Sequence, residues 1–486
     1  MIKLLKIKAI LFCLLLSIPA FAQNSAYVTP DSWSKHITAN GVKASSEGLS
    51  VGGGNLKIGL TTRAQLRFGE ESDTNIYQYA RAKLSGYELG SGEVNINLNV
   101  RGSWDSEAEP TLREFHVYWD GHDVSRDGED LDFRIYQANV ELNGVLPYTD
   151  IALGRVYLPA FNSYKIDGGN IAVSPVDWLK VNVFYGLPVS YYSYLETQVV
   201  GGGVDVPIES TGTRVRGEYS YFMHEDGGDY DTSVAKARLD QRILFANLYA
   251  EGAMIGDAWT YDVGVDGNIS ASNTGFSAYI MGQYDKNDGM INPYVGMFES
   301  ELGASSEYLM GGVQVMQGIT DYVMLSLGFE SRFNYDEAYG DRDYYRFFGT
   351  VDLVGLLHRN NYLSLIADYY TVEAYQRQDE NSKLLFGLRM TQVVNDNVEL
   401  WLGANVMNYQ YHANPIKYYQ GETGFSGISQ AEEEKNTTLA YIGGMWQVAD
   451  WCVLQVDYTF EYSDIFDSLD MDNNLHMVEL WLNFLW

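Results

Sequence analysis

The 486-residue sequence has very little cysteine and proline. It contains two cysteines, Cys13 and Cys452, and 10 prolines. Cys13 lies in an N-terminal segment that we expect to be removed, which leaves Cys452 alone and excludes an internal disulfide. A secreted chain of this size must then be stabilised by hydrogen bonding and packing.

Basic residues are also scarce. Lysine and arginine together number 32 against 64 acidic residues, so the formal net charge is −32. Such a chain repels phosphate backbones, and we expect no nucleic-acid partner. Intrinsically disordered chains can be equally acidic, but an aromatic content of 14% argues against disorder.

The N-terminus predicts export. Lys3, Lys6 and Lys8 precede the short apolar segment Ile10–Ile18, and Ala20-Phe21-Ala22 supplies the small residues of a cleavage site. We therefore expect residues 1–22 to be a signal peptide, with the mature chain beginning at Gln23. A lipoprotein site at Cys13 is disfavoured because the preceding Phe12 is too large.

Long apolar runs are missing after residue 22. The strongest apolar stretches, such as Tyr322–Phe329, are short and interrupted by Ser or Gly, whereas a spanning helix needs ~20 apolar residues. A β-barrel can cross a membrane without such a run because only alternate residues face lipid. The content of 38 Tyr and 48 Gly suits twisted strands with aromatic girdles and tight turns.

Alternating polarity marks several strands. In Glu93–Arg101 the apolar residues Val94, Ile96, Leu98 and Val100 share one face, and asparagines share the other. Leu56–Phe68 repeats this pattern with Lys57, Arg63 and Arg67 on its polar face. In a barrel the apolar face contacts lipid and the polar face lines water.

The connections between strands alternate in length in the C-terminal half. Short turns are expected at Gly318–Asp321, Val394–Asn397 and Val448–Asp450, with a longer one at Gly355–Asn361. Long polar loops are expected at Asn334–Asp343, Glu373–Ser382, Gln410–Asn436 and Ser463–Asn474. Outer-membrane barrels have this asymmetry, with short periplasmic turns and long extracellular loops.

The last strand carries the most specific pattern. Val478, Leu480, Leu482, Phe484 and Trp486 share one face, and the sequence ends on an aromatic residue. This ending resembles the C-terminal assembly signal of Gram-negative outer-membrane proteins. Glu479, Phe484 and Trp486 match the signal, whereas Trp481 stands where glycine is usual. The resemblance implies an outer-membrane location and a partner in the outer-membrane assembly machinery.

These observations predict an all-β fold, a transmembrane antiparallel β-barrel of about 18 strands, with 16–22 allowed by ~10 residues per strand. Residues 55–486 would form the barrel, and residues 23–54 would form a periplasmic leader or partial plug. The stretch Ser233–Ala253 is compatible with one long strand or a tight hairpin.

A barrel of this size leaves an aqueous lumen, which favours transport. The segment Ile151–Val173 resembles the region around the inward-folded third loop of porins. That resemblance implies a constriction loop with Pro159, Lys165 and Asp167, a porin for passive diffusion of small hydrophilic solutes or ions, and by analogy a homotrimer. Outer-membrane lipid and lipopolysaccharide are the expected surroundings.

The predicted lumen face is basic despite the acidity of the chain. Two roles remain open: a ladder that guides anions, or wall residues paired with lumenal carboxylates. The predicted pore-lining residues are Lys57, Arg63, Arg67, Arg81, Lys83, Arg101, Arg155, Arg214 and Arg216.

Other chemistry finds little support. The histidines lack metal-ligand spacing, no catalytic set is predicted, and we expect neither a metal nor a cofactor. An outer-membrane protease or lipase and a plugged solute receptor remain as alternative functions. About thirty residues precede Leu56 in the mature chain, which is short for a plug domain.

Overall fold

The computed structural model describes the strands and most of the short turns. The described residues are 48–51, 53–68, 73–105, 131–157, 165–189, 197–224, 232–256, 258–284, 307–335, 342–355, 360–374, 381–411, 433–463 and 474–485. The predictions for the signal peptide, Pro159 and Trp486 lie outside these residues.

Twenty-three strands are described. They are β1 (Leu49–Val51), β2 (Gly54–Phe68), β3 (Asp73–Leu89), β4 (Gly92–Asp105), β5 (Leu131–Leu146), β6 (Thr149–Tyr157), β7 (Lys165–Val176), β8 (Leu179–Pro188), β9 (Thr197–Ile208), β10 (Thr213–His224), β11 (Thr232–Ile243), β12 (Ala246–Ile255), β13 (Ala258–Ile269), β14 (Thr274–Tyr284), β15 (Tyr308–Thr320), β16 (Val323–Asn334), β17 (Arg342–Val354), β18 (Asn361–Ala374), β19 (Asn381–Asn395), β20 (Val398–Tyr411), β21 (Glu433–Ala449), β22 (Cys452–Ser463) and β23 (Asn474–Leu485). Among the described residues, no helix has the length and apolarity needed to span a membrane.

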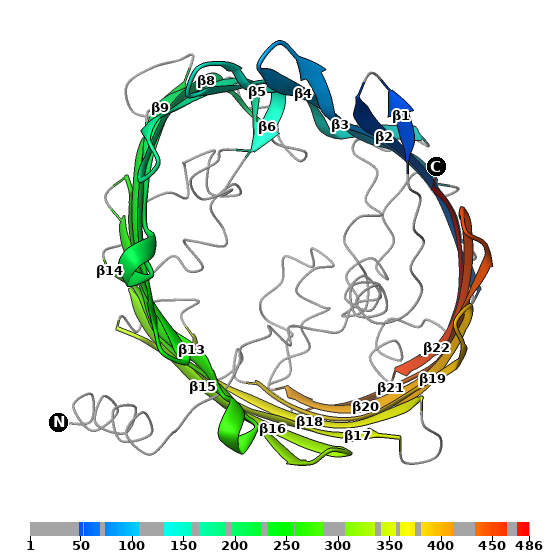
Figure 1. Cartoon of the computed structure of the whole chain (residues 1–486). Coiled ribbons are helices and arrows are strands. Elements are labelled where there is room, and N and C mark those ends of the chain that lie inside the picture. The colour runs from blue at the N-terminus through cyan, green and yellow to red at the C-terminus, as the bar shows by residue number, and fades with distance from the viewer. Residues whose placement is uncertain are drawn as a thin grey trace, which may run out of the picture.

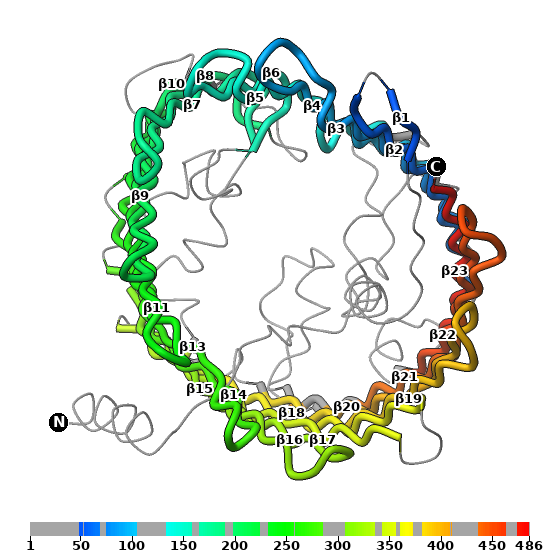
Figure 2. The backbone as a smooth tube through the Cα atoms, in the orientation of Figure 1, coloured from blue at the N-terminus to red at the C-terminus, as the bar shows by residue number. Residues whose placement is uncertain are grey.

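The strands form one closed barrel. From β2 onward each strand pairs antiparallel with the next, and β23 pairs with β2 to close the ring (Figures 1 and 2). The short β1 pairs only with the beginning of β2. The predicted all-β antiparallel barrel is confirmed, but the favoured count of about 18 is wrong, because the barrel has 22 strands, β2–β23.

The two ends of the barrel differ as the sequence predicts. Short turns join β3–β4, β5–β6 and alternate pairs onward to β21–β22, most of them two residues long. The other end carries the longer connections, including 106–130, 285–307 and 412–432. The first residue of β2 and the last of β23 lie at the short-turn end, which is the periplasmic end in outer-membrane barrels.

The strand register assigns each side chain to a face. Directly paired residues share a face, so Ile58, Ala82, Leu98 and Ala138 form one continuous row. Lys57, Lys83, Asn97 and Asn139 form the adjacent row on the opposite face. The first row is apolar and solvent-accessible, with Leu98 41% exposed, and defines the outer face. The second defines the inner face.

A row of glycines crosses the inner face near the long-loop end. Gly154, Gly168 and Gly186 pair in sequence across β6, β7 and β8. A Cβ at Gly168 would collide with the carbonyl oxygen of Tyr185, and Gly154 has φ +109°. Only glycine permits this close backbone approach.

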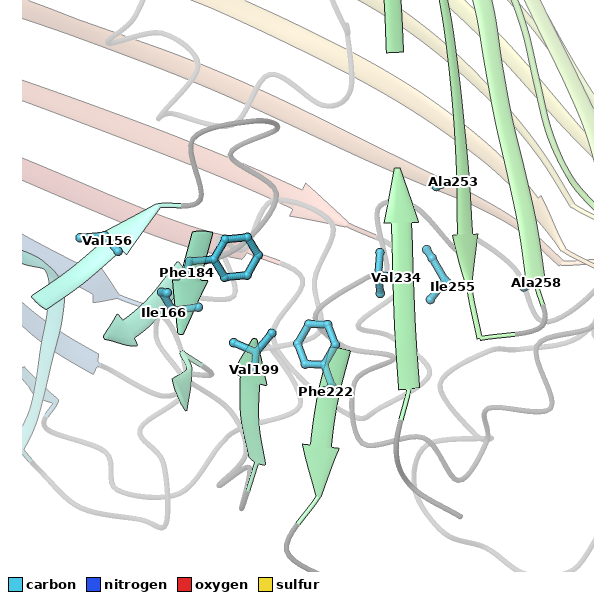
Figure 3. Close-up of a cluster of buried hydrophobic side chains, with 9 residues drawn as sticks. All are labelled: Val156, Ile166, Phe184, Val199, Phe222, Val234, Ala253, Ile255 and Ala258. Carbon is cyan, nitrogen blue, oxygen red and sulfur yellow. The ribbon is translucent and has the colours of Figure 1, made fainter. Parts of the chain in front are cut away.

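Around this row the inner face becomes apolar. Nine buried side chains lie along β6–β13 near the long-loop end (Figure 3). Phe222 and Ile166 are completely buried. We call this group the inner apolar cluster; it comprises Val156, Ile166, Phe184, Val199, Phe222, Val234, Ala253, Ile255 and Ala258.

Candidate pore wall

Three basic residues of β2 and β3 are exposed on the inner face. Lys57 and Lys83 are directly paired across the two strands, and Arg81 lies two residues along β3 from Lys83. None of the three forms an ion pair with a described residue. They constitute a concentration of positive charge on the inner wall, which we call the basic trio.

The other basic residues of the first strands are buried. Arg63 Nη2 donates to Glu479 Oε1 at 2.7 Å, and both side chains are 3% exposed. Arg101 is 1% exposed, with its guanidinium 5.4 Å from the centre of the Tyr77 ring. Arg67 is also buried. These side chains pack into the wall, where a passing solute has little access to their charges.

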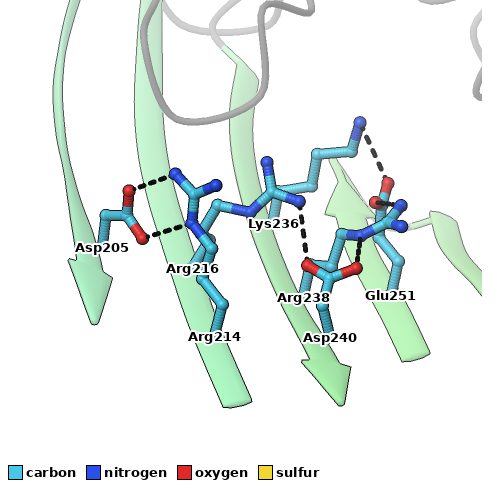
Figure 4. A network of polar contacts seen from close by, with 7 residues as sticks. All are labelled: Asp205, Arg214, Arg216, Lys236, Arg238, Asp240 and Glu251. Atoms are coloured by element: carbon cyan, nitrogen blue, oxygen red, sulfur yellow. Dashed lines mark hydrogen bonds and ion pairs between the residues drawn. The ribbon is translucent and has the colours of Figure 1, made fainter. Parts of the chain in front are cut away.

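Arg214 and Arg216 belong to an ion-pair network on β9–β12 (Figure 4). Arg214 Nη2 lies 2.5 Å from Asp205 Oδ2, and Arg216 Nη2 lies 3.0 Å from Asp240 Oδ2. Arg238 bridges Asp240 and Glu251, and Lys236 also contacts Glu251 at 3.2 Å. Every basic residue of this network contacts a carboxylate, but the four cations share three carboxylates, so most of the positive charge is compensated and one unit remains.

Carboxylates face the lumen half-way round the 22-strand ring from β2, on β13. Asp262 accepts a hydrogen bond from the Tyr249 hydroxyl at 3.1 Å, and Asp266 accepts one from Asn247 Nδ2 at 2.9 Å. Both of these donors are neutral, and the Arg238 guanidinium of the neighbouring network also interacts electrostatically with Asp262. The strands that carry the basic trio, β2 and β3, lie on the opposite side of the ring from β13, which carries this acidic pair (Figure 1).

Three predicted pore residues are placed differently. Lys165 and Asp167 belong to strand β7 and therefore do not lie in a constriction loop. Arg155 pairs with Ala138 and Asp167, which places it in the outer row with Leu98 rather than on the lumen wall. Gly168 and Gly169, which follow Asp167 in β7, permit close contact between the strands.

The predicted assembly residues lie on both faces of β23. Glu479 is buried on the inner face, and Phe484 lies on the outer face. The Phe484 ring stacks on Trp451 in the β21–β22 turn, with 6.0 Å between ring centres. No group of potential metal ligands occurs among the described residues.

The outer face and the closed ladder decide the environment of this protein. Every strand of the ring has two hydrogen-bonded neighbours, and the exposed outer side chains are predominantly Leu, Val, Ile and aromatic residues. Lipid accepts only such closed β-structures. The chain forms a bacterial outer-membrane β-barrel.

Comparisons of the sequence with known proteins do not indicate a function for this outer-membrane barrel. No protein-family model matches it. A stretch of 187 residues is 30% identical to a component of the NADH-quinone oxidoreductase of Thermosipho melanesiensis, covering 37% of this chain. The match covers 48% of that protein, so the chain spans about half the length of the curated relative, and we take no function from it.

Solved structures resemble the barrel remotely. A BenF-like porin from Pseudomonas fluorescens Pf-5 has 10% identity and a TM-score of 0.43, covering 89% of this chain and 98% of that one. OccD3 (OpdP) of Pseudomonas aeruginosa has 12% identity and a TM-score of 0.42, with 96% and 99% covered. The P pilus usher PapC translocation pore has 8% identity and a TM-score of 0.42, with 88% and 99% covered. Because a porin and an usher pore score almost alike, these likenesses do not distinguish functions.

Proposed function

We propose that this barrel is a channel for passive diffusion of small hydrophilic solutes and that it favours anions. The observation that carries the proposal is the basic trio, Lys57, Arg81 and Lys83. These side chains are exposed on the inner face and form no ion pair with a described residue. A cation on a wall beside restricted water attracts anionic solutes more strongly than the same charge in bulk water.

The neutralised basic residues contribute less to this preference. The carboxylates of Asp205, Asp240 and Glu251 compensate three of the four positive charges of the β9–β12 network at contact distance. The potential of a close ion pair falls off faster with distance than that of an isolated charge. Of the two roles left open by the sequence, guidance of anions is therefore assigned to the trio and wall stabilisation to the network.

The acidic pair on β13 refines the proposal. A solute crossing at the level of the trio experiences positive charge from β2–β3 and negative charge from Asp262 and Asp266. Solutes with a separated positive and negative end gain favourable energy by aligning with this field. We therefore expect monoanions and zwitterions to pass more readily than cations of equal size.

Single-channel conductance in a planar bilayer tests the proposal. Stable conducting steps, with a reversal potential displaced toward anions in asymmetric KCl, are the expected result. The double variant Arg81→Glu/Lys83→Glu should move the reversal potential toward cations. The charge-conserving variant Arg81→Lys/Lys83→Arg should leave it in place. A folded barrel without conducting steps would contradict the channel, and unchanged selectivity in the Glu variant would contradict the role of the trio.

A further inference from the structure

Basic side chains are distributed very unequally between the two faces of the wall. On the described strands, lysines and arginines share the inner face, with two exceptions, Arg155 and Lys165. Arg155 continues the outer row of Leu98 and Ala138, and Lys165 is paired with the outer residue Tyr157. A charged side chain that faces hydrocarbon destabilises a barrel, so the outward position of these two residues needs a physical reason.

Three neighbouring side chains and one backbone carbonyl hold these two cations in place. Arg155 donates to both carboxylate oxygens of Asp167, at 2.8 and 2.6 Å, and to the backbone carbonyl of Ile135. The Lys165 ammonium lies 4.6 Å from the centre of the Tyr157 ring and 5.7 Å from that of Tyr136. We call Arg155, Lys165, Asp167, Tyr136 and Tyr157 the outer basic cluster.

The outer basic cluster has a net positive charge, because it contains two cations and one carboxylate. Its upper edge is the pair Tyr157–Lys165, the last of the β6–β7 ladder before residues 158–164 at the long-loop end. Tyrosines collect where the membrane meets water, because their rings are apolar and their hydroxyls are polar. These features indicate the headgroup level of the outer leaflet.

Apolar surface adjoins the cluster on its periplasmic side, at Leu153, and laterally, at Leu187. Leu153 precedes Arg155 on the same face of β6, and Leu187 of β8 is paired with Asp167. Both leucines are more than half exposed on the outer face. Positive charge above and apolar surface below is the arrangement that complements a lipid with an anionic headgroup.

We propose that the outer basic cluster binds the phosphate group of a phosphorylated lipid in the outer leaflet, the headgroup chemistry of lipopolysaccharide. The Lys165 ammonium supplies the charge, and the hydroxyls of Tyr136 and Tyr157 donate hydrogen bonds to phosphate oxygens. Asp167 orients Arg155 and prevents it from withdrawing toward the lumen. The acyl chains then lie against Leu153 and Leu187. This site faces away from the lumen, so it does not depend on the proposed channel function.

Native mass spectrometry of the purified barrel with defined lipids tests this site. The probes are lipid A carrying phosphate, the same lipid with its phosphates removed, and inorganic phosphate alone. Phosphorylated lipid A should bind wild-type protein most tightly, and Lys165→Gln should weaken that binding about fivefold. Lys165→Arg should retain it. Arg242→Gln is the matched control, because it also removes one positive charge and Arg242 is exposed on the inner face.

The comparison of probes identifies the ligand. Equal binding of the dephosphorylated lipid would overturn the proposal, as would binding unaffected by Lys165→Gln. An equal loss in Arg242→Gln would show that net charge alone governs lipid binding and would likewise reject the site. Saturable binding of inorganic phosphate that excludes the lipid would replace a lipid site with a free-phosphate site. Heat-modifiable migration of each variant verifies that the barrel has folded.

Discussion

Arg63 and Glu479 form a buried ion pair across the junction that closes the barrel. Arg63 lies on β2 and Glu479 on β23, and their closest side-chain atoms are 2.7 Å apart. Trp481, two residues along β23, places its ring 4.9 Å from the Arg63 guanidinium, and Tyr77 contacts it from β3 at 5.3 Å. Arg63, predicted to line the pore, and Glu479, predicted to belong to the assembly signal, therefore both stabilise the junction between β2 and β23. Trp481, which stands where the terminal signal usually has glycine, also contributes to this junction through its contact with Arg63.

Arg63→Glu should impair barrel closure. It leaves two buried carboxylates facing each other, and breaking a buried ion pair costs about 3–5 kcal/mol. The expected result is loss of the heat-modifiable form from the outer-membrane fraction. The exchanged pair Arg63→Glu/Glu479→Arg should recover part of it, whereas failure of the exchange together with normal assembly of both single variants would show that the pair is dispensable.

Cysteine accessibility should follow the two faces of β4. Asn97 lies on the inner face, where its amide contacts Asn139 and Glu141, and Leu98 lies on the outer face. In a Cys452→Ser background, Asn97→Cys should react with a small water-soluble thiol reagent in intact membranes and Leu98→Cys should not. Similar labelling of both positions would contradict the register.

Charge reversal in the β9–β12 network should affect stability more than selectivity. Arg216→Glu would place a third carboxylate beside Asp205 and Asp240. We expect a lower unfolding temperature with a reversal potential that moves less than in Arg81→Glu/Lys83→Glu. A larger displacement in Arg216→Glu than in that double variant would transfer the selectivity role to the network.

Aromatic residues at the end of β23 should be needed for assembly. Replacing Phe484 and Trp486 by alanine removes the ring that stacks on Trp451 and the terminal aromatic of the assembly signal. The variant should be degraded in the periplasm and depleted from the outer membrane. Normal amounts of heat-modifiable barrel in that fraction would count against the prediction.

Gly168→Ala should destabilise the wall, because the new methyl group would meet the backbone of Tyr185 and Gly186. Overpacking of this kind costs about 1–3 kcal/mol, and the unfolding midpoint in denaturant should fall accordingly. Gly102→Ala is the matched control, because no atom lies within 4 Å of a Cβ placed there. Equal unfolding midpoints for the two variants would show that β7 and β8 can move apart to accept the methyl group with little loss of stability.

The faces of the wall could be predicted from the sequence, whereas the number of strands could not. Alternation is a local property, and in β2 and β4 it places Lys57 and Asn97 correctly on the polar face. Strand number depends on recognising turns. Ser233–Ala253 is a hairpin, and its turn consists of Leu244 and Phe245, with Leu244 at φ +51°. Apolar residues at such a turn lack the Gly, Asn or Asp signal that predicts it.

Pairing across distant strands explains the remaining differences. Arg63 and Glu479 are far apart in sequence, so nothing local indicates that they neutralise each other. Arg155 alternates within a segment that looked like a strand followed by a loop, and its face is determined by pairing with Ala138 and Asp167. The basic trio was included in the predicted set, but exposure and the absence of ion pairs with described residues distinguish it only in three dimensions.

Because the barrel has an even number of strands, the neighbouring strands β2 and β23 are antiparallel. The first residue of β2 and the last residue of β23 therefore lie at the same end of the barrel. A linker there could join them, and the chain could be cut instead within 225–231 or another long connection, leaving the ladder of every strand pair intact. A circularly permuted gene of this kind would encode the same barrel with its ends displayed on the cell surface. It would also move the terminal aromatic away from the end of the chain. The permuted protein would therefore show whether assembly depends on the pairing of β2 with β23 or on recognition of a terminal aromatic by the assembly machinery.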